Sequence, residues 1–333
     1  LKSWCDSLVS GAVGLVNPVP VEVHAVLVER GDALTEVIEI LNAGDPISWE
    51  LERASGGGSG VPAPSQLLEL HRWLAAAAVD GAQQNDPARG SAALEASWQL
   101  NQESLRRPER ELRVAAYTVL ELDLAILRRV PLPVDGSVWL ERLGQMDPVA
   151  RLDEWVLLDA YSLPSATRRG TVLDGEGLWS LIGSLTVDPA RRWLLMSASE
   201  SLRIGTASVS AADIPNLDPD LRFVESYRRV PRWNRLARSA LPNPWYEWLS
   251  AGRAGLALHL TAEVLRIEAL SAQEFDELFS SLPLRRASRV PGAIWMWAVE
   301  EDALRILLEI EKEPTIHTVQ LSYPPLTQQV RPE

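Results

Sequence analysis

The sequence contains one cysteine, Cys5, and only four histidines among its 333 residues. A single cysteine cannot form an intrachain disulfide, and so few thiols and imidazoles exclude zinc-finger, iron–sulfur and histidine-rich metal sites. A lipid-attachment or redox role for Cys5 would need a surrounding signal, and none accompanies it. We therefore expect an ordinary thiol near the N-terminus.

Long apolar runs are missing as well. The apolar stretch Leu8–Val16 has nine residues and is interrupted by serine and glycine, whereas a bilayer-spanning helix needs about 20. We predict no membrane-spanning segment within the chain. Because the sequence begins with Leu1 rather than methionine, we expect that an upstream piece was removed, and a signal peptide or membrane anchor could have lain there.

Basic residues are outnumbered. The chain has 32 Lys and Arg against 45 Asp and Glu, a net charge of −13. This charge disfavours nucleic acid or an anionic membrane surface as the main partner. The hydrophobic fraction of 46% and the charged fraction of 23% are those of a globular protein with a real core. A chain of this length forms one large domain or two ordinary ones.

Catalytic signatures are absent too. The sequence has no Gly-x-Ser-x-Gly elbow, no phosphate-binding or dinucleotide-binding glycine loop, and no Glu-x-x-His motif. We therefore predict no catalytic residue set, no metal site and no cofactor. One enzymatic alternative stays open, since His259 and Glu263 are four residues apart on one helical face and Glu268 follows about a turn later. The structural interpretation of this set is a hydrogen bond on a helix surface.

The pattern of apolar residues predicts a mainly α fold of antiparallel helical hairpins or a bundle, with a small C-terminal antiparallel β meander. We divide it into a mixed N-terminal segment (1–60) ending in the glycine-rich linker Gly56–Gly60, a helical domain (61–283) and the meander (284–333). The alternation of Val21, Val23, Ala25 and Leu27 predicts a short strand in the first segment. Helices are expected over 33–41, 65–84, 87–105, 108–129, 137–143, 148–161, 176–185, 189–204, 220–229, 233–240, 244–270 and 272–279. Strands are expected over 293–299, 303–311 and 315–323.

An arginine-rich segment, Arg222–Arg238, stands out in this acidic chain. It holds six arginines against one glutamate, with aromatic residues between them. One interpretation is a site for an anion, a nucleic acid or an acidic partner, with a protein partner ahead of nucleic acid. The other is a strip of internal ion pairs. The residues that we assign to partner binding are Arg228, Arg229, Arg232, Trp233 and Arg235.

Tryptophan is unusually common, with 13 residues against three phenylalanines. Most of them are expected to fill the core. Trp295 and Trp297 share one face of a predicted strand, and we add this pair to the partner-binding residues. Trp245, Tyr246 and Trp248 form a second cluster, which is the alternative site for a sugar or lipid ligand.

Four segments follow one another in the second half of the chain. They are Arg228–Ala237, Ala240–Pro244, a long helix with Leu256–Leu258, and Ser271–Pro283. In this order they resemble the C-terminal half of uncharacterised, mostly helical bacterial envelope proteins that end in a short β segment like the tail of type II secretion pseudopilins.

The helical hairpins between Pro64 and Val130 resemble the front half of that family. Leu284–Arg289 stands where the family carries an Asp-Pro-Phe-Asp-Gly-like turn. The resemblance implies a helical fold and a location in the periplasm or cell envelope, and it implies no activity.

The first functional hypothesis is a non-enzymatic interaction or assembly protein, a subunit of a cell-envelope complex with a protein partner and no nucleic acid. The alternatives are an envelope module that binds a sugar or lipid through tryptophans, and an enzyme of unrecognised type. The location expected otherwise is the cytoplasm, and membrane association would depend on a segment before Leu1.

Overall fold

The computed structural model describes residues 1–10, 17–44, 63–106, 110–152, 156, 188–209, 217–281, 284–287, 293–300, 303–310 and 321–322. It is mainly helical, which confirms the predicted fold class at that level. The chain forms two compact units: unit 1 holds residues 1–146 and 253–333, and unit 2 holds residues 147–252. The boundaries predicted near residues 60 and 283 lie outside the described residues and stay predictions.

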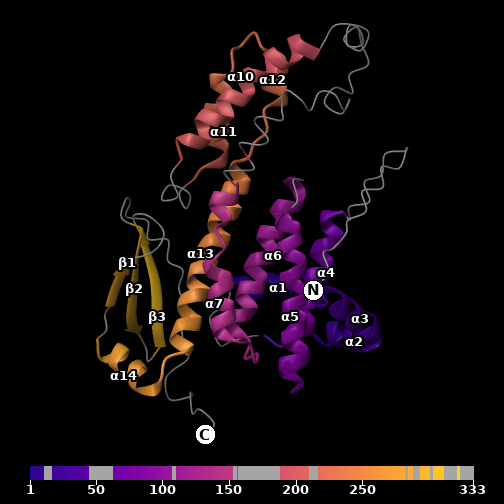
Figure 1. Cartoon of the computed structure of the whole chain (residues 1–333), viewed down its shortest axis with the longest axis vertical. Helices are drawn as coiled ribbons and strands as arrows, with labels where there is room; N and C mark the ends of the chain where they lie inside the picture. Colours follow the sequence, from indigo (N-terminus) through magenta and orange to yellow (C-terminus); the bar gives the residue numbers. More distant parts are fainter. Residues whose placement is uncertain are drawn as a thin grey trace. The chain divides into compact units, whose positions relative to one another are not determined.

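Three helices form the core of unit 1: α4 (Pro64–Gln83), α5 (Pro87–Leu105) and α6 (Arg110–Arg129). They lie side by side (Figure 1). The predicted break between α4 and α5 is confirmed, because Asp86 accepts a hydrogen bond from Arg89 N and caps a helix that begins with Pro87. The inward faces are apolar, as the sequence pattern predicts. Among the buried side chains are Leu74, Ala75, Ala78, Ala93, Leu94, Leu120, Leu124 and Ile126.

Glycines let α4 and α5 approach each other at backbone distance. A Cβ added to Gly81 would lie 2.7 Å from Gly90 N and 2.8 Å from Asp86 O. A Cβ on Gly90 would lie 2.7 Å from Ala78 O. All three distances are below van der Waals contact, so the crossing requires glycine at these two positions.

Three shorter helices pack against this core: α1 (Lys2–Ser10) against α4 and α6, α2 (Val21–Glu29) against α4, and α3 (Gly31–Asn42) against α5. The strand predicted over Val21–Leu27 is wrong, because the segment is helical. Val23 and Leu27, two members of the alternating set, are also four residues apart, and they are the two buried residues of α2. Residues four positions apart share a face in a strand and also in a helix, so this spacing did not distinguish the two structures.

Unit 1 also contains α7 (Gly136–Gly144), the larger part of α13 (Trp245–Glu268) and α14 (Ala272–Ser280). Trp139 of α7 packs edge-on against Trp98 of α5, with ring centroids 4.9 Å apart. Arg128 at the end of α6 donates to Thr261 Oγ1 at 2.7 Å and to Ala257 O at 3.1 Å on α13.

Four strands follow: β1 (Leu284–Ala287), β2 (Ala293–Glu300), β3 (Ala303–Ile310) and β4 (Leu321–Ser322). They pair antiparallel in the order β1-β2-β3-β4. In the register of β2 and β3, Trp295 stands opposite Leu308 and Trp297 opposite Ile306.

The described residues of unit 2 include α10 (Asp188–Ala207), α11 (Pro219–Arg229), α12 (Arg235–Ala240) and the first turns of α13. Asp218 caps α11 by accepting from the backbone N–H groups of Asp220 and Leu221. One apolar cluster among its described residues consists of Ala198, Leu202, Val230, Ala237 and Leu241.

Several predictions fall outside the described residues: the linker 56–60, the helix 176–185 and most of 148–161. None of the described helices combines the length with the apolar composition that a membrane-spanning helix needs.

Candidate functional site

The turn between α11 and α12 is fixed by one buried amide. Asn234 Nδ2 donates to Leu194 O at 2.7 Å and to Ser197 Oγ at 2.8 Å, both on α10. Its Oδ1 accepts from Ala237 N at 3.1 Å and so caps α12. One side chain therefore holds the turn against α10 and sets the position of Trp233, the residue before it.

Trp233 is stacked on Trp193 of α10, and both rings face solvent. Their centroids are 5.9 Å apart and the planes are inclined by 22°. Trp193 is 62% exposed, Trp233 is 64% exposed, and Met196, three residues along α10 from Trp193, is 60% exposed. Large apolar side chains are rarely left in water together, so this cluster indicates a surface that binds something.

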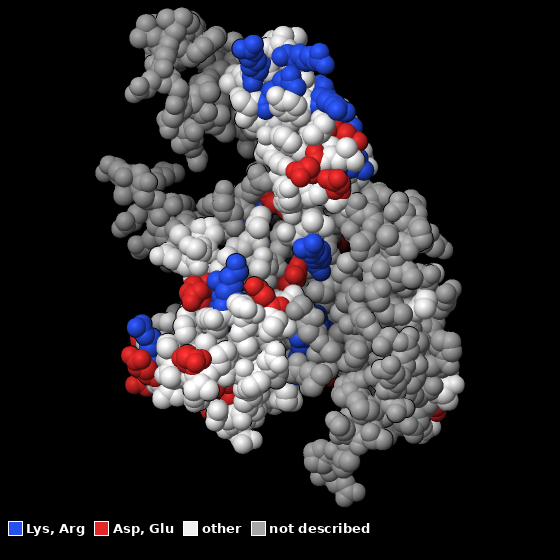
Figure 2. All heavy atoms as spheres, turned by 180° about the vertical axis from the view of Figure 1, so that it is seen from behind, with Lys and Arg blue, Asp and Glu red and all other residues white. Residues whose placement is uncertain are grey.

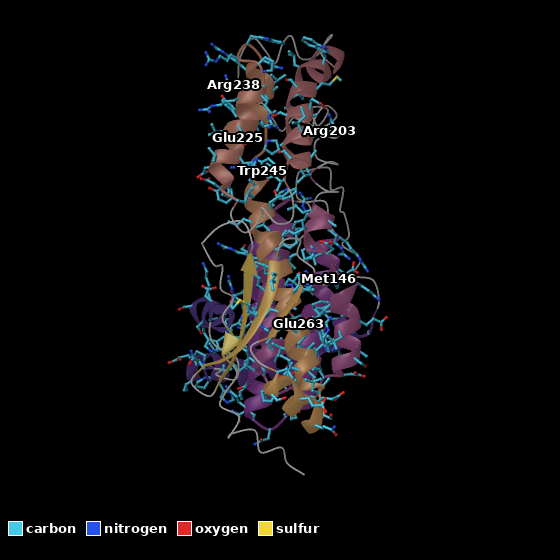
Figure 3. The ribbon with its side chains drawn as sticks, turned by 90° about the vertical axis from the view of Figure 1, so that its left-hand side faces the viewer. Met146, Arg203, Glu225, Arg238, Trp245 and Glu263 are labelled. Atoms are coloured by element: carbon cyan, nitrogen blue, oxygen red, sulfur yellow. The ribbon has the colours of Figure 1, made fainter. Side chains whose placement is uncertain are left out.

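The arginine-rich segment divides into paired and unpaired side chains. Arg222 forms an ion pair with Glu225 at 3.3 Å, and the Arg238 guanidinium lies 3.8 Å from the Tyr227 ring centroid. In Figure 3, Arg238 and Glu225 lie on one side of unit 2, and Arg203 of α10 lies on the other. Arg222 thus forms an ion pair within the segment, as the second interpretation expects, whereas the contact of Arg238 is with an aromatic ring.

The remaining four arginines of the segment are exposed and have no ion-pair partner among the described residues. They are Arg228, Arg229, Arg232 and Arg235. Figure 2 shows basic side chains gathered at one end of this unit, with its carboxylates nearer the other end. We call these four arginines together with Trp193, Met196 and Trp233 the Trp–Arg surface.

Sequence reasoning missed Trp193 and Met196. The signal was present, because the buried stripe of α10 runs through Leu195, Ala198 and Leu202, and Trp193 and Met196 lie off that stripe. A large apolar residue that lies outside the buried face of an amphipathic helix is expected to be exposed, and this pattern identifies candidate binding residues.

The structure does not expose the tryptophans of the alternative ligand site. Trp245 and Trp248 are buried, with ring centroids 5.9 Å apart, and Trp245 packs against Gly205. Tyr246 is half exposed and donates its hydroxyl to Asp220 Oδ1 at 3.0 Å, which raises the pKa of the phenol. Trp245 and Trp248 therefore present no ring face on which a sugar could stack.

Trp295 and Trp297, the other predicted partner-binding pair, lie two residues apart on β2. Their backbone positions are set by the β2–β3 register, and their side chains lie outside the described residues. Their role in partner binding stays a prediction.

The contacts of Glu263 do not support the alternative of an enzyme that uses His259 with Glu263. Glu263 accepts a hydrogen bond from Arg266 on the same helix, and His259 is half-buried. Among the described residues, no group of three or more His, Cys, Asp or Glu could hold a metal ion.

A buried polar network crosses the core of unit 1. His71 Nδ1 donates to Ser97 Oγ at 2.9 Å, and Ser97 Oγ donates to Asp123 Oδ1 at 2.6 Å. Burial lowers the pKa of His71 to about 3 and raises the pKa of Asp123 to about 8, so both groups are neutral at pH 7. The serine lies between histidine and aspartate, whereas acyl transfer needs the histidine between the other two. The network therefore joins α4, α5 and α6 rather than activating a nucleophile.

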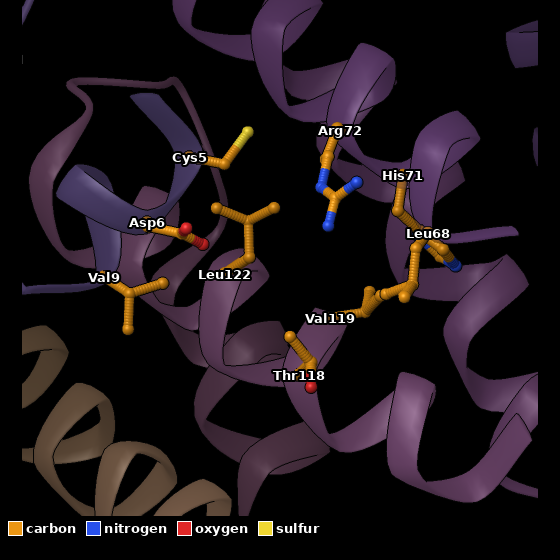
Figure 4. Close-up of a pocket in the computed structure, with 9 residues that line it drawn as sticks. All are labelled: Cys5, Asp6, Val9, Leu68, His71, Arg72, Thr118, Val119 and Leu122. Carbon is orange, nitrogen blue, oxygen red and sulfur yellow. The ribbon is translucent and has the colours of Figure 1, made fainter. Parts of the chain in front are cut away.

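A small cavity of about 30 Å³ lies beside His71, between α1, α4 and α6 (Figure 4). Cys5 lines it from α1, and Arg72 extends toward it from α4. Burial raises the pKa of the Cys5 thiol to about 11, so the thiol is protonated and unreactive at neutral pH. The volume suits one or two water molecules and is far below that of a substrate pocket.

Replacing Asn234 by alanine is expected to lower the free energy of unfolding of unit 2 by about 1–2 kcal/mol, because a cap and two buried hydrogen bonds are lost. It should also weaken the far-ultraviolet exciton couplet of the Trp193–Trp233 stack in circular dichroism. Ser239→Ala, at an exposed position of α12, is the matched control and should change neither. An unchanged couplet in Asn234→Ala would show that the amide does not position Trp233.

Comparison with known proteins gives no family for this chain. No family model, no curated protein and no solved structure matches it significantly.

Proposed function

We propose that this chain is a non-enzymatic interaction protein, a subunit of a larger assembly, and that it binds a protein partner through the Trp–Arg surface. The observation that carries the proposal is the exposed Trp193–Trp233 stack, with Arg232 and Arg235 exposed on either side of Trp233 in the sequence and without an ion pair to any described residue. Tryptophan, arginine and methionine are the residue types enriched at the centres of protein interfaces.

The energetics favour a partner that covers this surface. A tryptophan ring can bury about 150–250 Å² and contributes strongly to interface stability once water is excluded. Asn234 holds the turn in place before binding, so little conformational entropy is lost when the stack is covered. The surface is thus preorganised for binding.

The charge of the surface selects the partner's chemistry. Arg228, Arg229, Arg232 and Arg235 offer guanidinium groups that pair with carboxylates in bidentate geometry. Nucleic acid also carries anionic groups, but unit 2 as a whole has 12 Lys and Arg against 13 Asp and Glu. A protein surface with carboxylates around an apolar centre fits better than a polyanion.

Two further parts of the proposal concern the fold of the C-terminal residues and the location of the chain. We propose that residues 284–333 form an antiparallel β meander on the helical body and that the chain works in the cell envelope. The ground for this location is the order of segments in the sequence, which resembles that of helical envelope proteins. The sugar- or lipid-binding alternative lacks a supporting observation at Trp245 and Trp248, since both rings are buried.

The test is a paired charge reversal, Arg232→Glu with Arg235→Glu. We expect the variant to keep the helical content and melting temperature of the parent, because both side chains are exposed, and to lose a copurifying protein partner. The measurement is mass spectrometry of proteins crosslinked to the purified chain.

Arg203→Glu is the matched control, since Arg203 is an exposed arginine of unit 2 outside the Trp–Arg surface. It should retain the partner. A partner that is retained by Arg232→Glu with Arg235→Glu, or lost equally in Arg203→Glu, would contradict the proposed function.

A further inference from the structure

A second exposed apolar surface lies on the hairpin of α2 and α3. Val21, Ala25 and Val28 follow one another at helical spacing along α2, and all three are exposed. Glu22 and Glu29 flank this stripe with the same spacing. The aliphatic side chains on α2 are therefore edged by carboxylates.

Helix α3 repeats the arrangement. Ala33 and Ile40 are exposed and seven residues apart, so they lie on one face. Asp32, Glu36 and Glu39 run beside them, also exposed. Both helices of the hairpin thus combine an exposed aliphatic stripe with a row of acidic groups.

None of these five carboxylates has an ion-pair partner among the described residues. We call the five, together with Val21, Val28 and Ile40, the acidic hairpin. The five are Glu22, Glu29, Asp32, Glu36 and Glu39.

The acidic hairpin is fixed to the core of unit 1. His24 Nδ1 donates to Asp80 Oδ1 at 2.6 Å, and Asn42 Nδ2 donates to Ala92 O at 2.9 Å. A docking surface held in this way loses little conformational freedom on binding.

We propose that the partner of the Trp–Arg surface is the acidic hairpin of a second copy of this chain. The inference rests on the proposed function, since it names the partner of the same surface. Each surface supplies what the other lacks: unpaired guanidinium groups around aromatic rings on one, and unpaired carboxylates around aliphatic side chains on the other.

The distribution of charge along the chain supports the pairing. Unit 1 has 20 Lys and Arg against 32 Asp and Glu, whereas unit 2 is nearly balanced, with 12 against 13. Almost all of the excess negative charge therefore lies in the unit that carries the acidic hairpin, and the unpaired arginines lie in the other.

The proposed contact joins unlike surfaces, so it is heterologous rather than two-fold symmetric. A heterologous contact leaves one free Trp–Arg surface and one free acidic hairpin at the ends of every open assembly. The assembly should therefore grow with protein concentration, and because its rim is ionic it should weaken as salt is added.

The experiment is sedimentation velocity of the whole chain over increasing concentration, at low and high salt. The parent protein should associate at low salt. Arg232→Glu with Arg235→Glu, and separately Glu36→Arg with Glu39→Arg, should each raise the apparent dissociation constant at least about tenfold. A mixture of the two variants should associate again, because each then offers a surface opposite in charge to one on the other.

Two controls fix the interpretation. Arg203→Glu and Glu141→Arg reverse exposed charges outside both surfaces and should associate like the parent. A parent that stays monomeric at every concentration, or reversed variants that do not recover on mixing, would overturn the inference. A different protein that binds the parent but not Arg232→Glu with Arg235→Glu would sustain the proposed function while overturning the second copy as its partner.

Discussion

Replacing Gly81 by alanine should lower the free energy of unfolding of unit 1 by about 3 kcal/mol. The new Cβ would lie 2.7 Å from Gly90 N and 2.8 Å from Asp86 O, both backbone atoms that cannot turn aside. Alanine gains about 1 kcal/mol of helix propensity over glycine. The forced separation of α4 from α5 outweighs that gain, because overpacking in a core costs about 1–3 kcal/mol and more where the neighbour is rigid. Urea unfolding followed by circular dichroism measures the change.

Gly144→Ala is the matched control, since a Cβ at this position meets nothing within 4 Å. Its unfolding free energy should change by no more than about 0.5 kcal/mol. A Gly81→Ala variant as stable as Gly144→Ala would show that α4 and α5 do not cross at backbone contact.

Between pH 6.5 and pH 8 the protein should lose about 2 kcal/mol of stability through Asp123, a loss that Asp123→Asn should abolish. The pKa of Asp123 is about 8 in the folded chain and 3.8 ordinarily, so over this range the folded state holds a proton that the unfolded state has released. Each pH unit then disfavours folding by 1.36 kcal/mol, which gives about 2 kcal/mol over 1.5 units.

Below pH 6.5 the buried histidine has the opposite effect. The pKa of His71 is about 3 in the folded chain and 6.5 ordinarily, so between these values the unfolded state holds the extra proton and stability rises with pH. The contributions of His71 and Asp123 offset each other between about pH 4 and 6.5. In Asp123→Asn only the rise from His71 remains.

The measurement is the unfolding free energy of the parent and of Asp123→Asn at pH 5, 6.5 and 8. Burial also raises the pKa of Glu121, but that group is the same in both proteins and drops out of the comparison. Parallel profiles for the two proteins would show that Asp123 is ionised in the folded state.

Much of the helical framework could be predicted because its signals are local. Asp86 and Pro87 mark the start of α5 through a side-chain cap and a proline that needs no N–H there. The apolar face of α4 follows from spacing alone, and Leu74, Ala75 and Ala78 are buried as that spacing predicts.

The remainder depends on contacts between residues distant in sequence. Ser97 lies 26 residues from both His71 and Asp123, and no local pattern indicates that the three meet. The stacking of Trp193 on Trp233 likewise requires the turn to be held against α10 by Asn234. The sequence pattern identified the arginines and Trp233, but it did not identify Trp193, the residue that stacks on Trp233.

The most direct test of the central claim is site-specific photo-crosslinking from the Trp–Arg surface. A photoreactive phenylalanine derivative at Met196, which is exposed beside Trp193, should form covalent adducts with a protein partner in the native assembly. The same probe at Val138, an exposed position on α7, should form none. Adducts at position 196 that disappear in Arg232→Glu with Arg235→Glu are the predicted result. No adduct at position 196, or equal adducts at positions 196 and 138, would contradict the claim that this surface binds a partner.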